Sequence, residues 1–317
     1  MLYDFIIIGG GPAAVASGVY AARKRLKTLL ITESFGGQSI VSADIQNWIG
    51  EPHISGFDLA KKFEEHVRAY PDILEVKTPE KAVAVRKTGD GNFEVQTEDG
   101  TIYQGRAVML ASGARRRKLG VPGEAELDGK GVAYCSTCDA PIFSGKRVAV
   151  VGGGNAGLEA VVDLFPYASK IFLLEYGDVL KGDPVTQDEV RKNPKVEIIF
   201  NVESKAVLGD KLVTGLRYLD RKENIEKTLE LDGVFVEIGS VPNSEPVKEL
   251  AELDKYGQVV IDSKHGTTSV PGIFAAGDVT DDPYKQNNIS AGDAVKATLA
   301  AYAYLLKRSK ESPAAEK

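Results

Sequence analysis

An internal repeat built on glycine constrains this chain more than any other feature. An apolar run that ends in three glycines occurs twice, at Phe5 to Gly11 and again at Val148 to Gly154. A helix-like pattern follows each copy, and a second apolar run that ends at an acidic residue comes after it. An apolar run, a glycine turn and a helical pattern predict a strand, a turn and a helix. The repeat therefore predicts two α/β units of one design.

The spacing within each copy is typical of dinucleotide binding. Glu33 follows Gly9 by 24 positions and Glu175 follows Gly152 by 23, close to the roughly 20-residue offset at which an acid meets a ribose hydroxyl. The glycines let the backbone approach a pyrophosphate, and the helix N-terminus offers it unpaired N–H groups. One such turn is weak evidence, but two favour binding over glycines that merely turn the chain. The residues predicted to line the turns are Gly9, Gly11, Pro12, Ala13 and Ala14 in the first copy and Gly152, Gly154, Asn155, Ala156 and Gly157 in the second.

Length and charge exclude several other classes of protein. The 317 residues suggest about two domains. The net charge of -6 opposes binding to nucleic acid, and a short basic run such as 115–117 does not make a large positive patch. Near the start, the longest apolar stretch is far shorter than the roughly 20 residues that span a bilayer, and no secretion signal is visible. We therefore expect a cytoplasmic protein with no nucleic-acid or membrane partner.

Segments between and after the repeats predict how the two units are connected. A hairpin is expected around Asp99-Gly100, followed by a buried strand in 107–113 that returns to the first core. Two matched Gly/Pro crossovers, at 119–124 and 238–243, bracket the second copy as an insertion. The prediction is an α/β fold with two Rossmann-like (three-layer ββα) domains, the second inserted in the first. We expect the outer domain to comprise 1–115 and 245–317 and the inserted domain 116–244.

The two cysteines of the chain form a C-x-x-C motif, Cys135-Ser136-Thr137-Cys138. A structural zinc site needs four ligands, and no further cysteine and only scattered histidines are present, so no metal is predicted. Two buried cysteines acting as small apolar residues would leave the spacing unexplained. In a reducing compartment this spacing favours a dithiol/disulfide centre, in which one thiolate attacks a disulfide and the other resolves the intermediate.

Asp139 follows the cysteine pair directly and has two possible roles. It could exchange a proton with the leaving thiolate, or it could cap the helix that we expect to start at Asp139-Ala-Pro-Ile. A helix start here would also lower the pKa of a nearby thiolate. We favour the proton role, and the spacing alone does not assign separate roles to the two cysteines.

Together these motifs resemble the low-molecular-weight thioredoxin reductase family over nearly the whole chain. The resemblance implies FAD in the outer domain, a nicotinamide dinucleotide in the insertion, a redox disulfide in the insertion and a homodimer. It also implies that Cys138 faces the flavin and that Cys135 attacks the partner. The FAD residues expected on this basis, besides those of the first turn, are Glu33, Gly36, Gly37, Gln38, Asn47, Ala111, Gly113, Gly277, Asp278, Lys285 and Gln286.

The sequence departs from the NADPH-dependent members of that family after the second strand of the insertion. Where those enzymes carry a His-Arg-Arg-x-x-x-Arg stretch for the 2′-phosphate, this chain has Glu175-Tyr-Gly-Asp-Val-Leu-Lys181. A carboxylate at Glu175 would accept hydrogen bonds from a free 2′-hydroxyl and repel a phosphate, and we do not expect Lys181 alone to reverse this. We therefore predict NADH over NADPH.

This loop is most similar to the reductase portion of the flavoprotein component of alkyl hydroperoxide reductase, which has an additional N-terminal thioredoxin-like region. Met1 stands just before the first strand, so we expect the acceptor disulfide on a separate thioredoxin- or glutaredoxin-like protein that could supply a peroxiredoxin. The expected relay runs from NADH to FAD, to the Cys135–Cys138 pair and to this partner. Because nicotinamide and disulfide must both reach the flavin, the crossovers are expected to act as hinges.

Two rival functions stay open at this point. One is a related flavoprotein that receives electrons from ferredoxin or another carrier, with the second glycine turn vestigial. The other is a redox-sensing protein that binds dinucleotides without turnover. Reduction of the flavin by stoichiometric NADH would exclude the first, and steady NADH-dependent reduction of a disulfide would exclude the second.

Overall fold

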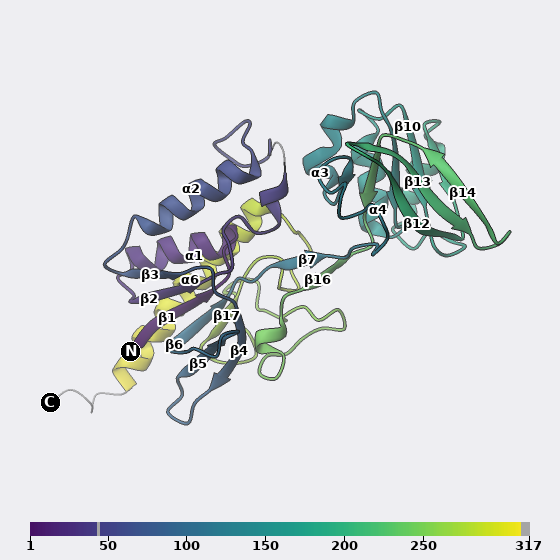
Figure 1. The fold of residues 1–317 in the computed structure, drawn as a ribbon. Helices are drawn as coiled ribbons and strands as arrows, with labels where there is room; N and C mark the ends of the chain where they lie inside the picture. Colours follow the sequence, from purple (N-terminus) through teal and green to yellow (C-terminus); the bar gives the residue numbers. More distant parts are fainter. Residues whose placement is uncertain (43–44, 312–317) are drawn as a thin grey trace. The chain divides into compact units, whose positions relative to one another are not determined.

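The computed structural model describes residues 1–42 and 45–311, which form two compact units that we describe one at a time (Figure 1). One unit comprises Met1–Val41, Trp48–Arg115 and Val241–Lys317, and the other is built on Arg116–Ser240. The second division falls four residues before the predicted boundary at 244/245. At both divisions the chain runs through a short strand, β7 (Ala114–Arg116) or β16 (Ser240–Pro242), and these two strands pair.

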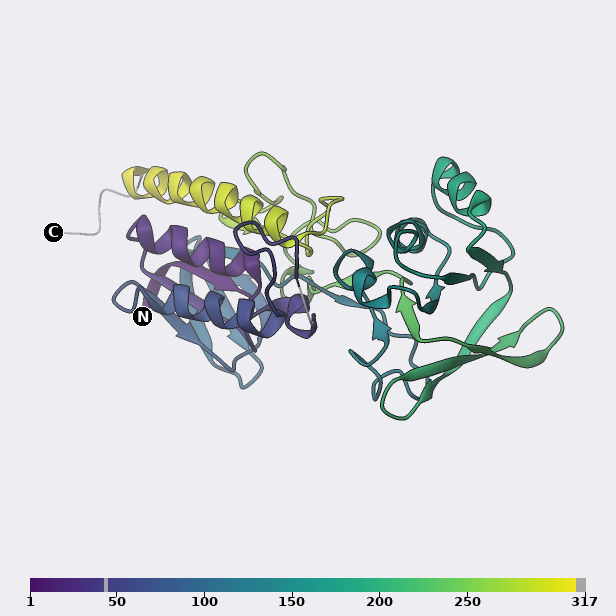
Figure 2. The same cartoon turned by 90° about the horizontal axis from the view of Figure 1, so that it is seen from above.

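The first unit is a seven-stranded sheet with three long helices packed beside one another (Figure 2). Strand β1 pairs in parallel with β2 on one side and with β6 on the other, which places the first glycine turn at the centre of the sheet. The sheet order is β3 (Leu74–Lys77), β2 (Thr28–Ile31), β1 (Leu2–Ile8), β6 (Ile102–Leu110), β5 (Phe93–Thr97) and β4 (Ala82–Lys87), with β17 (Ile273–Ala275) also on β6, and the helices are α1 (Pro12–Arg23), α2 (Gly56–Arg68) and α6 (Asn287–Glu311).

The expected hairpin around Asp99-Gly100 is confirmed, because β5 and β6 pair in antiparallel fashion on either side of it. The buried strand that we expected separately in 107–113 is the second half of β6. Gly105 lets the strand continue across the sheet, since a Cβ at that position would lie 2.7 Å from a side-chain carbon of Ile6. The first half of β6 pairs with β5 and the second half with β17.

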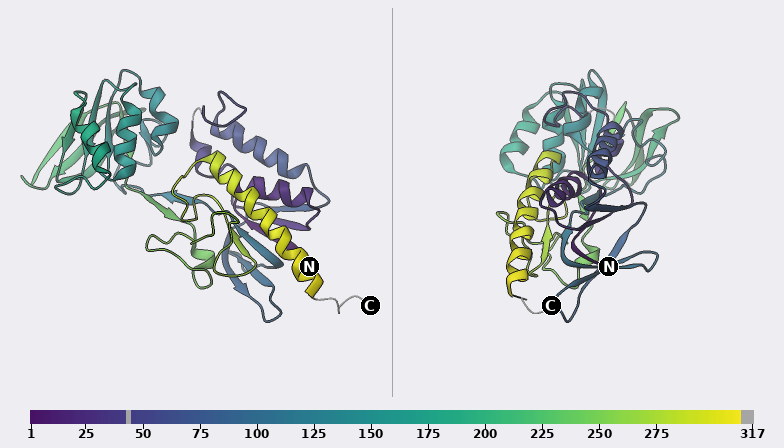
Figure 3. Two further views of the ribbon diagram at one scale, coloured as in Figure 1. Left: turned by 180° about the vertical axis from the view of Figure 1, so that it is seen from behind. Right: turned by 90° about the vertical axis from the view of Figure 1, so that its left-hand side faces the viewer.

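The second unit has three layers (Figure 3). Its parallel sheet lies between helices and a separate antiparallel sheet, and β9 shows both interfaces: Val148 and Val150 belong to the core on the helix side, whereas Ala149 and Val151 belong to the core shared with the antiparallel sheet. The predicted fold class is confirmed. The strand order of the parallel sheet is β11 (Val196–Ile199), β10 (Lys170–Leu174), β9 (Arg147–Val151), β15 (Gly233–Val236) and β8 (Val132–Ala133). The strand order of the antiparallel sheet is β12 (Val202–Gly209), β13 (Val213–Asp220) and β14 (Ile225–Glu230). The helices are α3 (Ser136–Asp139), α4 (Asn155–Leu164) and α5 (Pro184–Lys192).

The first Gly/Pro crossover lies inside the second unit, and the chain passes between the units at β7 instead. The buried carboxylate of Glu124 accepts hydrogen bonds from the backbone N–H groups of Leu119 and Gly120, at 2.8 and 2.7 Å, and from the hydroxyl of Tyr134 at 2.9 Å. The sequence suggested a link because glycine and proline mark any tight turn. Three short 3-10 helices complete the described elements: η1 (Gly37–Val41), η2 (Ala140–Phe143) and η3 (Glu245–Val247).

No helix in the described ranges is long and apolar enough to cross a membrane. The apolar residues of α6 differ in burial. Ala301 and Leu305 are buried within the first unit, whereas Leu299 and Leu306 are exposed.

Candidate active site and dinucleotide turns

The first glycine turn is shaped by a close approach of two backbones. Gly9 has a φ of +129°, and a Cβ there would lie 2.1 Å from the carbonyl oxygen of Ala111. Helix α1 starts at Pro12 without a side-chain cap, and its first internal hydrogen bond runs from the N–H of Val15 to the carbonyl of Gly11 at 3.1 Å. The N–H groups of Ala13 and Ala14 precede that bond, so this helix start fits a phosphate group.

Two other predicted cofactor segments lie beside this turn. A Cβ on Gly37 would lie 3.3 Å from the Cα of Gly11, and a Cβ on Gly277 would lie 3.3 Å from the Cβ of Ala13. Gln38, which follows Gly37, donates a hydrogen bond of 2.9 Å to the carboxylate of Asp278, which follows Gly277. This bond connects the two segments. The close-set glycine backbones and the uncapped helix fit the pyrophosphate and sugar portions of FAD.

The remaining residues predicted to bind FAD differ in burial, hydrogen bonding and backbone conformation. The ammonium of Lys285 donates to the carbonyl of Thr280 at 2.6 Å, and burial lowers its pKa. Gly113 has a φ of +66° with open space where a Cβ would be, Gly36 has a φ of +101°, and Asn47 is exposed. Gln286 accepts the Ser290 N–H at the start of α6 through its carbonyl.

The second glycine turn reproduces the first. Gly152 has a φ of +120°, and a Cβ there would lie 2.4 Å from the carbonyl oxygen of Glu237. Helix α4 starts after Gly154 without a side-chain cap, and Leu158 donates its first internal bond to Gly154 at 3.0 Å. A Cβ on Gly157 would lie 1.7 Å from the carbonyl oxygen of Gly152, so only glycine fits there. The N–H groups of Asn155 and Ala156 lie before the first helical bond, as in the first unit.

Glu175 is buried and bonded to the turn itself. One carboxylate oxygen accepts the Gly153 N–H at 2.7 Å and the other accepts the Gly177 N–H at 2.8 Å. The ammonium of Lys181 lies 3.5 Å from this carboxylate. Each oxygen has a second lone pair, so Glu175 retains the capacity to accept from a ribose hydroxyl.

The two acids of the repeat occupy different positions, although their spacings in the sequence are similar. The N–H of Gly9 bonds to the carbonyl of Ile31 and that of Gly152 bonds to Leu174, both at 2.9 Å. The residue after Leu174 is Glu175, whereas the residue after Ile31 is Thr32. Glu33 lies one position further on, and its side chain is 65% exposed and 3.7 Å from Lys81, whereas that of Glu175 is 7% exposed.

A groove of about 860 Å³ runs along the second turn. It is bordered by residues 152–156, by Glu175 and Lys181, and by the loop 119–122. Tyr176 also lines it, and the guanidinium of Arg221 stacks 3.9 Å from the centre of the Tyr176 ring. The groove has the size of a nucleotide site, with a mixed apolar and polar lining.

Cys135 and Cys138 form a disulfide with a Cα–Cα distance of 5.4 Å. The helix begins within the motif, with Cys135 at the N-cap of α3, and not at Asp139 as expected. The Asp139 side chain makes no cap hydrogen bond, so the capping interpretation was wrong. Burial, with a smaller contribution from Asp128, raises the pKa of Asp139 to about 6. This carboxyl can therefore hold or release a proton near neutral pH.

The sheet order explains why these groups lie together. Glu175 follows β10, Gly152 follows β9, and Cys135 lies two residues after β8. Carboxyl ends of parallel strands meet at one edge of a sheet, so the nucleotide groove and the disulfide share that edge. Between them, after β15, lies Glu237, which the sequence analysis missed. An acid directly after an apolar strand, the arrangement that singled out Glu175, was the available signal.

The disulfide turn is also attached to the nucleotide helix. Asp163 of α4 accepts hydrogen bonds from the hydroxyls of Ser136 at 2.8 Å and Thr137 at 3.2 Å. Sequence reasoning did not identify Asp163, because its partners lie 27 and 26 positions away. Helix α4 therefore contacts the dinucleotide turn at its start and the redox turn through Asp163.

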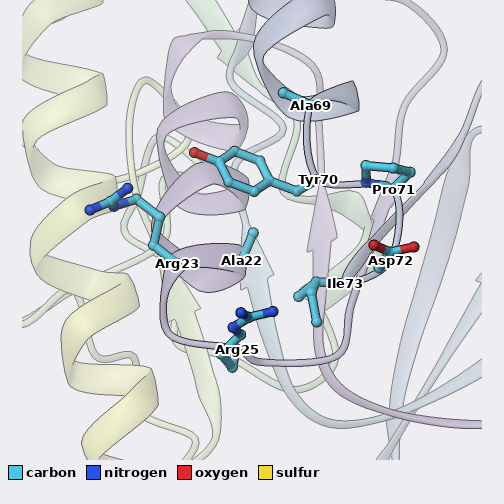
Figure 4. A pocket seen from close by; sticks show the side chains of 8 residues that line it. All are labelled: Ala22, Arg23, Arg25, Ala69, Tyr70, Pro71, Asp72 and Ile73. Carbon is cyan, nitrogen blue, oxygen red and sulfur yellow. The ribbon is translucent and has the colours of Figure 1, made fainter.

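A smaller pocket of about 360 Å³ lies elsewhere in the first unit, between Arg23, Arg25 and Tyr70 (Figure 4). It is lined by the last residues of α1 and by Ala69, the C-cap of α2. Helix C-termini carry partial negative charge, so this pocket lacks the helix N-terminus that favours a phosphate at the glycine turns. Within the described residues no group of three or more potential metal ligands is found.

The chain has clear relatives. The family model described as pyridine nucleotide-disulphide oxidoreductase matches residues 3–301. The chain is 44% identical over 309 residues to the F subunit of alkyl hydroperoxide reductase from Pseudomonas aeruginosa and 42% identical over 305 residues to an NADH dehydrogenase of Bacillus subtilis. These alignments cover 97% and 96% of this chain but 59% of each relative. The thioredoxin reductase of Streptococcus pyogenes superposes with a TM-score of 0.87 at 34% identity, covering 96% of this chain and 99% of that one.

Proposed function

Because this chain belongs to the pyridine nucleotide-disulphide oxidoreductase family, we propose that it is a flavoprotein disulfide reductase that takes electrons from NADH. In this proposal FAD binds at the first turn and NADH at the second. The electrons leave through the Cys135–Cys138 disulfide to a thioredoxin- or glutaredoxin-like protein, which could supply a peroxiredoxin. The boundaries of the two cofactor domains and the roles of the individual site residues are part of the same proposal.

The single observation that carries the proposal is that the disulfide and the second glycine turn share one sheet edge. A disulfide with a structural role alone would have no reason to lie beside a nucleotide groove. Asp163 also bonds the redox turn to the helix that begins at that groove. In this proposal electrons enter and leave through the same folded unit.

FAD, when bound, supplies the two-electron chemistry that links a hydride donor to a disulfide. The chain's own contribution is to hold it. The first turn would bind the pyrophosphate through the N–H groups of Ala13 and Ala14, and Asp278, fixed by Gln38, would face the sugar chain. Glu33 remains the residue proposed for the adenosine ribose, because its exposed carboxylate has free acceptor capacity.

NADH is proposed over NADPH because of the charge at Glu175. Its carboxylate is anchored by two backbone N–H groups, so it cannot swing away from an added phosphate. Lys181 and Arg221 lie nearby, but Lys181 is paired with Glu175 and Arg221 is stacked on Tyr176. One of the relatives that match over nearly the whole chain is named an NADH dehydrogenase, which supports an NADH-linked enzyme.

Asp139 is proposed to exchange a proton with the sulfur that leaves when the disulfide opens. Its raised pKa, about 6, lets it carry that proton at neutral pH. Cys138 is proposed to face the flavin and Cys135 to attack the partner. Movement of the insertion about the β7–β16 connection would present the nicotinamide and then the disulfide to the flavin. A homodimer and a cytoplasmic location remain predictions.

The direct test is anaerobic stopped-flow reduction of the purified yellow protein with NADH and, separately, with NADPH. We expect rapid bleaching of the flavin by NADH and much slower bleaching by NADPH. The same assay, run to steady state with a thioredoxin-like disulfide, should lose turnover in Cys135→Ser and in Cys138→Ser while bleaching by NADH persists. Equal rates with both nucleotides would overturn the assignment of NADH, and turnover without either cysteine would overturn the relay.

A further inference from the structure

Glu237 lies at a strand end between the second glycine turn and the cysteine pair. It follows β15 directly, and β15 lies between β9, which leads into the glycine turn, and β8, which leads into Cys135. Its backbone carbonyl forms the wall against which Gly152 is packed. Its side chain is 6% exposed, so a carboxyl group is buried between the nucleotide groove and the disulfide.

Few groups compensate the charge of this carboxyl. The guanidinium of Arg116 lies 3.9 Å away, and the backbone N–H of Ser136 makes a polar contact that favours the charged form. The carboxylates of Asp163 and Glu159, both on α4, have the same charge as ionised Glu237 and raise its pKa. Burial dominates these effects and raises the pKa of Glu237 to about 7. A buried acid with one distant cation and two like charges is poised to change its protonation when a nearby charge changes.

The nearby group whose charge changes during the proposed reaction is the cysteine pair. Ser136, which Glu237 contacts, is the residue between Cys135 and Thr137 at the start of α3. Opening the disulfide adds two electrons, breaks the S–S bond and leaves two sulfur anions that compete for protons. A thiolate and a nearby carboxylate repel each other, so the protonation of one group depends on the charge of the other.

We propose that Glu237 is a positioning residue whose charge sets how readily the reduced cysteines ionise. The two electrons come from the reduced flavin of the proposed function, and one proton goes to one sulfur. The second proton is shared among the other sulfur, the Asp139 carboxyl that exchanges protons in the proposed function, and the Glu237 carboxylate. An ionised Glu237 disfavours the thiolate, and a neutral Glu237 permits it. The inference rests on the proposed function only for the step that reduces the disulfide.

The test measures the ionisation of the cysteines in the full chain after chemical reduction with dithiothreitol, so it requires no nucleotide. The reduced protein is reacted with iodoacetamide over a range of pH, and the rate at each cysteine is followed by mass spectrometry. Glu237→Gln keeps an oxygen acceptor for the Ser136 N–H and removes only the charge. We expect its midpoint pH for alkylation to fall by about one unit relative to the wild type, as for removal of a neighbouring like charge.

Two further variants separate charge from structure. Glu230→Gln makes the same chemical change at a side chain that is 88% exposed, and we expect its midpoint to equal that of the wild type. Glu237→Ala removes both the charge and the acceptor, and we expect it to shift the midpoint as far as Glu237→Gln does. An unchanged midpoint in Glu237→Gln, or a shift in the alanine variant alone, would overturn the proposal and assign Glu237 a packing role.

The wild-type protein provides a second measurement in case the variants do not fold. Infrared difference spectra between the disulfide and dithiol forms should show a protonated-carboxyl band on reduction that titrates near pH 7, as for Glu237, in addition to any band that titrates near pH 6, as for Asp139. Absence of any carboxyl change would contradict the proposal. Failure of the proposed function has a different signature, because NADH would then leave the flavin or the cysteines unreduced while the alkylation profiles stay as described.

Discussion

The two glycine turns have nearly the same backbone conformation, but the residues at the ends of their flanking strands are neutral in one turn and acidic in the other. In the first unit, the residues that follow the flanking strands β2 and β6 are Thr32 and Ala111. At the equivalent positions of the second unit, after β10 and β15, the residues are Glu175 and Glu237. Both acids of the second unit are buried. One turn therefore has neutral flanks, and the other lies between two carboxyl groups.

This difference fits the different tasks proposed for the turns. The strand ends that flank the first turn add no charge that opposes a pyrophosphate, which suits a cofactor that stays bound. A turn flanked by acids binds the same group less tightly, which suits a nucleotide that must leave after each hydride transfer. The acids also place charge near the adenosine ribose on one side and near the cysteine pair on the other. We therefore propose that the repeat gives the binding geometry and that the strand-end residues give each turn its specificity.

The largest expected effect comes from a matched pair of substitutions, Gly9→Ala and Gly152→Ala. Each adds a Cβ that would clash with a carbonyl oxygen, at 2.1 and 2.4 Å, and each residue has a strongly positive φ. We expect each to abolish binding at its own turn. Gly9→Ala should yield colourless protein, whereas Gly152→Ala should stay yellow and no longer be bleached by NADH. Loss of flavin from Gly152→Ala would contradict the proposal that FAD binds at the first turn and NADH at the second.

The neutral flank of the first turn can be made acidic with Ala111→Glu. A carboxylate beside the pyrophosphate would cost about 3 kcal/mol through like-charge repulsion, which is about a hundredfold weaker binding of FAD. Flavin retention after dialysis, with the dissociation constant from fluorescence, measures the effect. Ala111→Gln has nearly the same size and controls for steric crowding. Equal losses in both variants would show that charge is not the difference between the turns.

The acidic edge of the second unit should also cost stability at high pH. The pKa of Asp139 is raised from 3.8 to about 6 in the folded chain, so the folded state holds this proton more tightly than the unfolded state. Stability therefore falls as pH rises from about 4 to about 6, and the full cost persists above that range. We expect Asp139→Asn to stabilise the second unit by about 2 kcal/mol at pH 8 and to change little below pH 4.

Hydrogen exchange resolved by segment is the appropriate measurement for that variant, since it reports each unit separately. The expected slowing is confined to strands such as β8 and β15, and the exchange of β1 and β2 should not change. A gain of stability that is equal at pH 4 and pH 8 would contradict the assigned titration.

The smallest effect is expected at the nucleotide specificity position. Glu175→Gln keeps an oxygen acceptor and removes the negative charge beside the ribose. We expect the preference for NADH over NADPH, measured as the ratio of kcat/KM values, to fall about tenfold, equivalent to about 1.4 kcal/mol. Thr32→Gln is the matched change at the first turn and should leave the ratio unaltered. An unaltered ratio in Glu175→Gln would show that Lys181 and Arg221 govern the choice.

The sequence predicted the features of this site that are local in the chain. Glycine turns, strand and helix order, and the C-x-x-C pair all depend on residues within a few positions of one another, so patterns identify them. Helix α2 could also have been predicted, because the Ser55 side chain accepts the Asp58 N–H at its start and its apolar residues recur at helical spacing. Sequence spacing did not separate Glu33 from Glu175, because their offsets differ by one residue and strand ends are uncertain by that amount.

The features that sequence did not predict depend on sheet order. Glu237 is 85 positions from Gly152 and 102 from Cys135, and only the placement of β15 between β9 and β8 brings the three together. Asp163 was missed for a related reason, since its contact to the redox turn depends on how α3 packs against α4. Patterns in one sequence identify the elements, and the neighbours of an element come from tertiary structure.

The central claim is that electrons entering at the acid-flanked turn leave through the cysteine pair. Its most direct test is an anaerobic titration of the yellow full-length chain with NADH, in which flavin absorbance and the alkylation of each cysteine are followed together. We predict that both cysteines become reactive as NADH is added and that Gly152→Ala shows neither bleaching nor reactive cysteines. Full bleaching of the wild-type flavin by excess NADH, with Cys135 and Cys138 still unreactive, would contradict it.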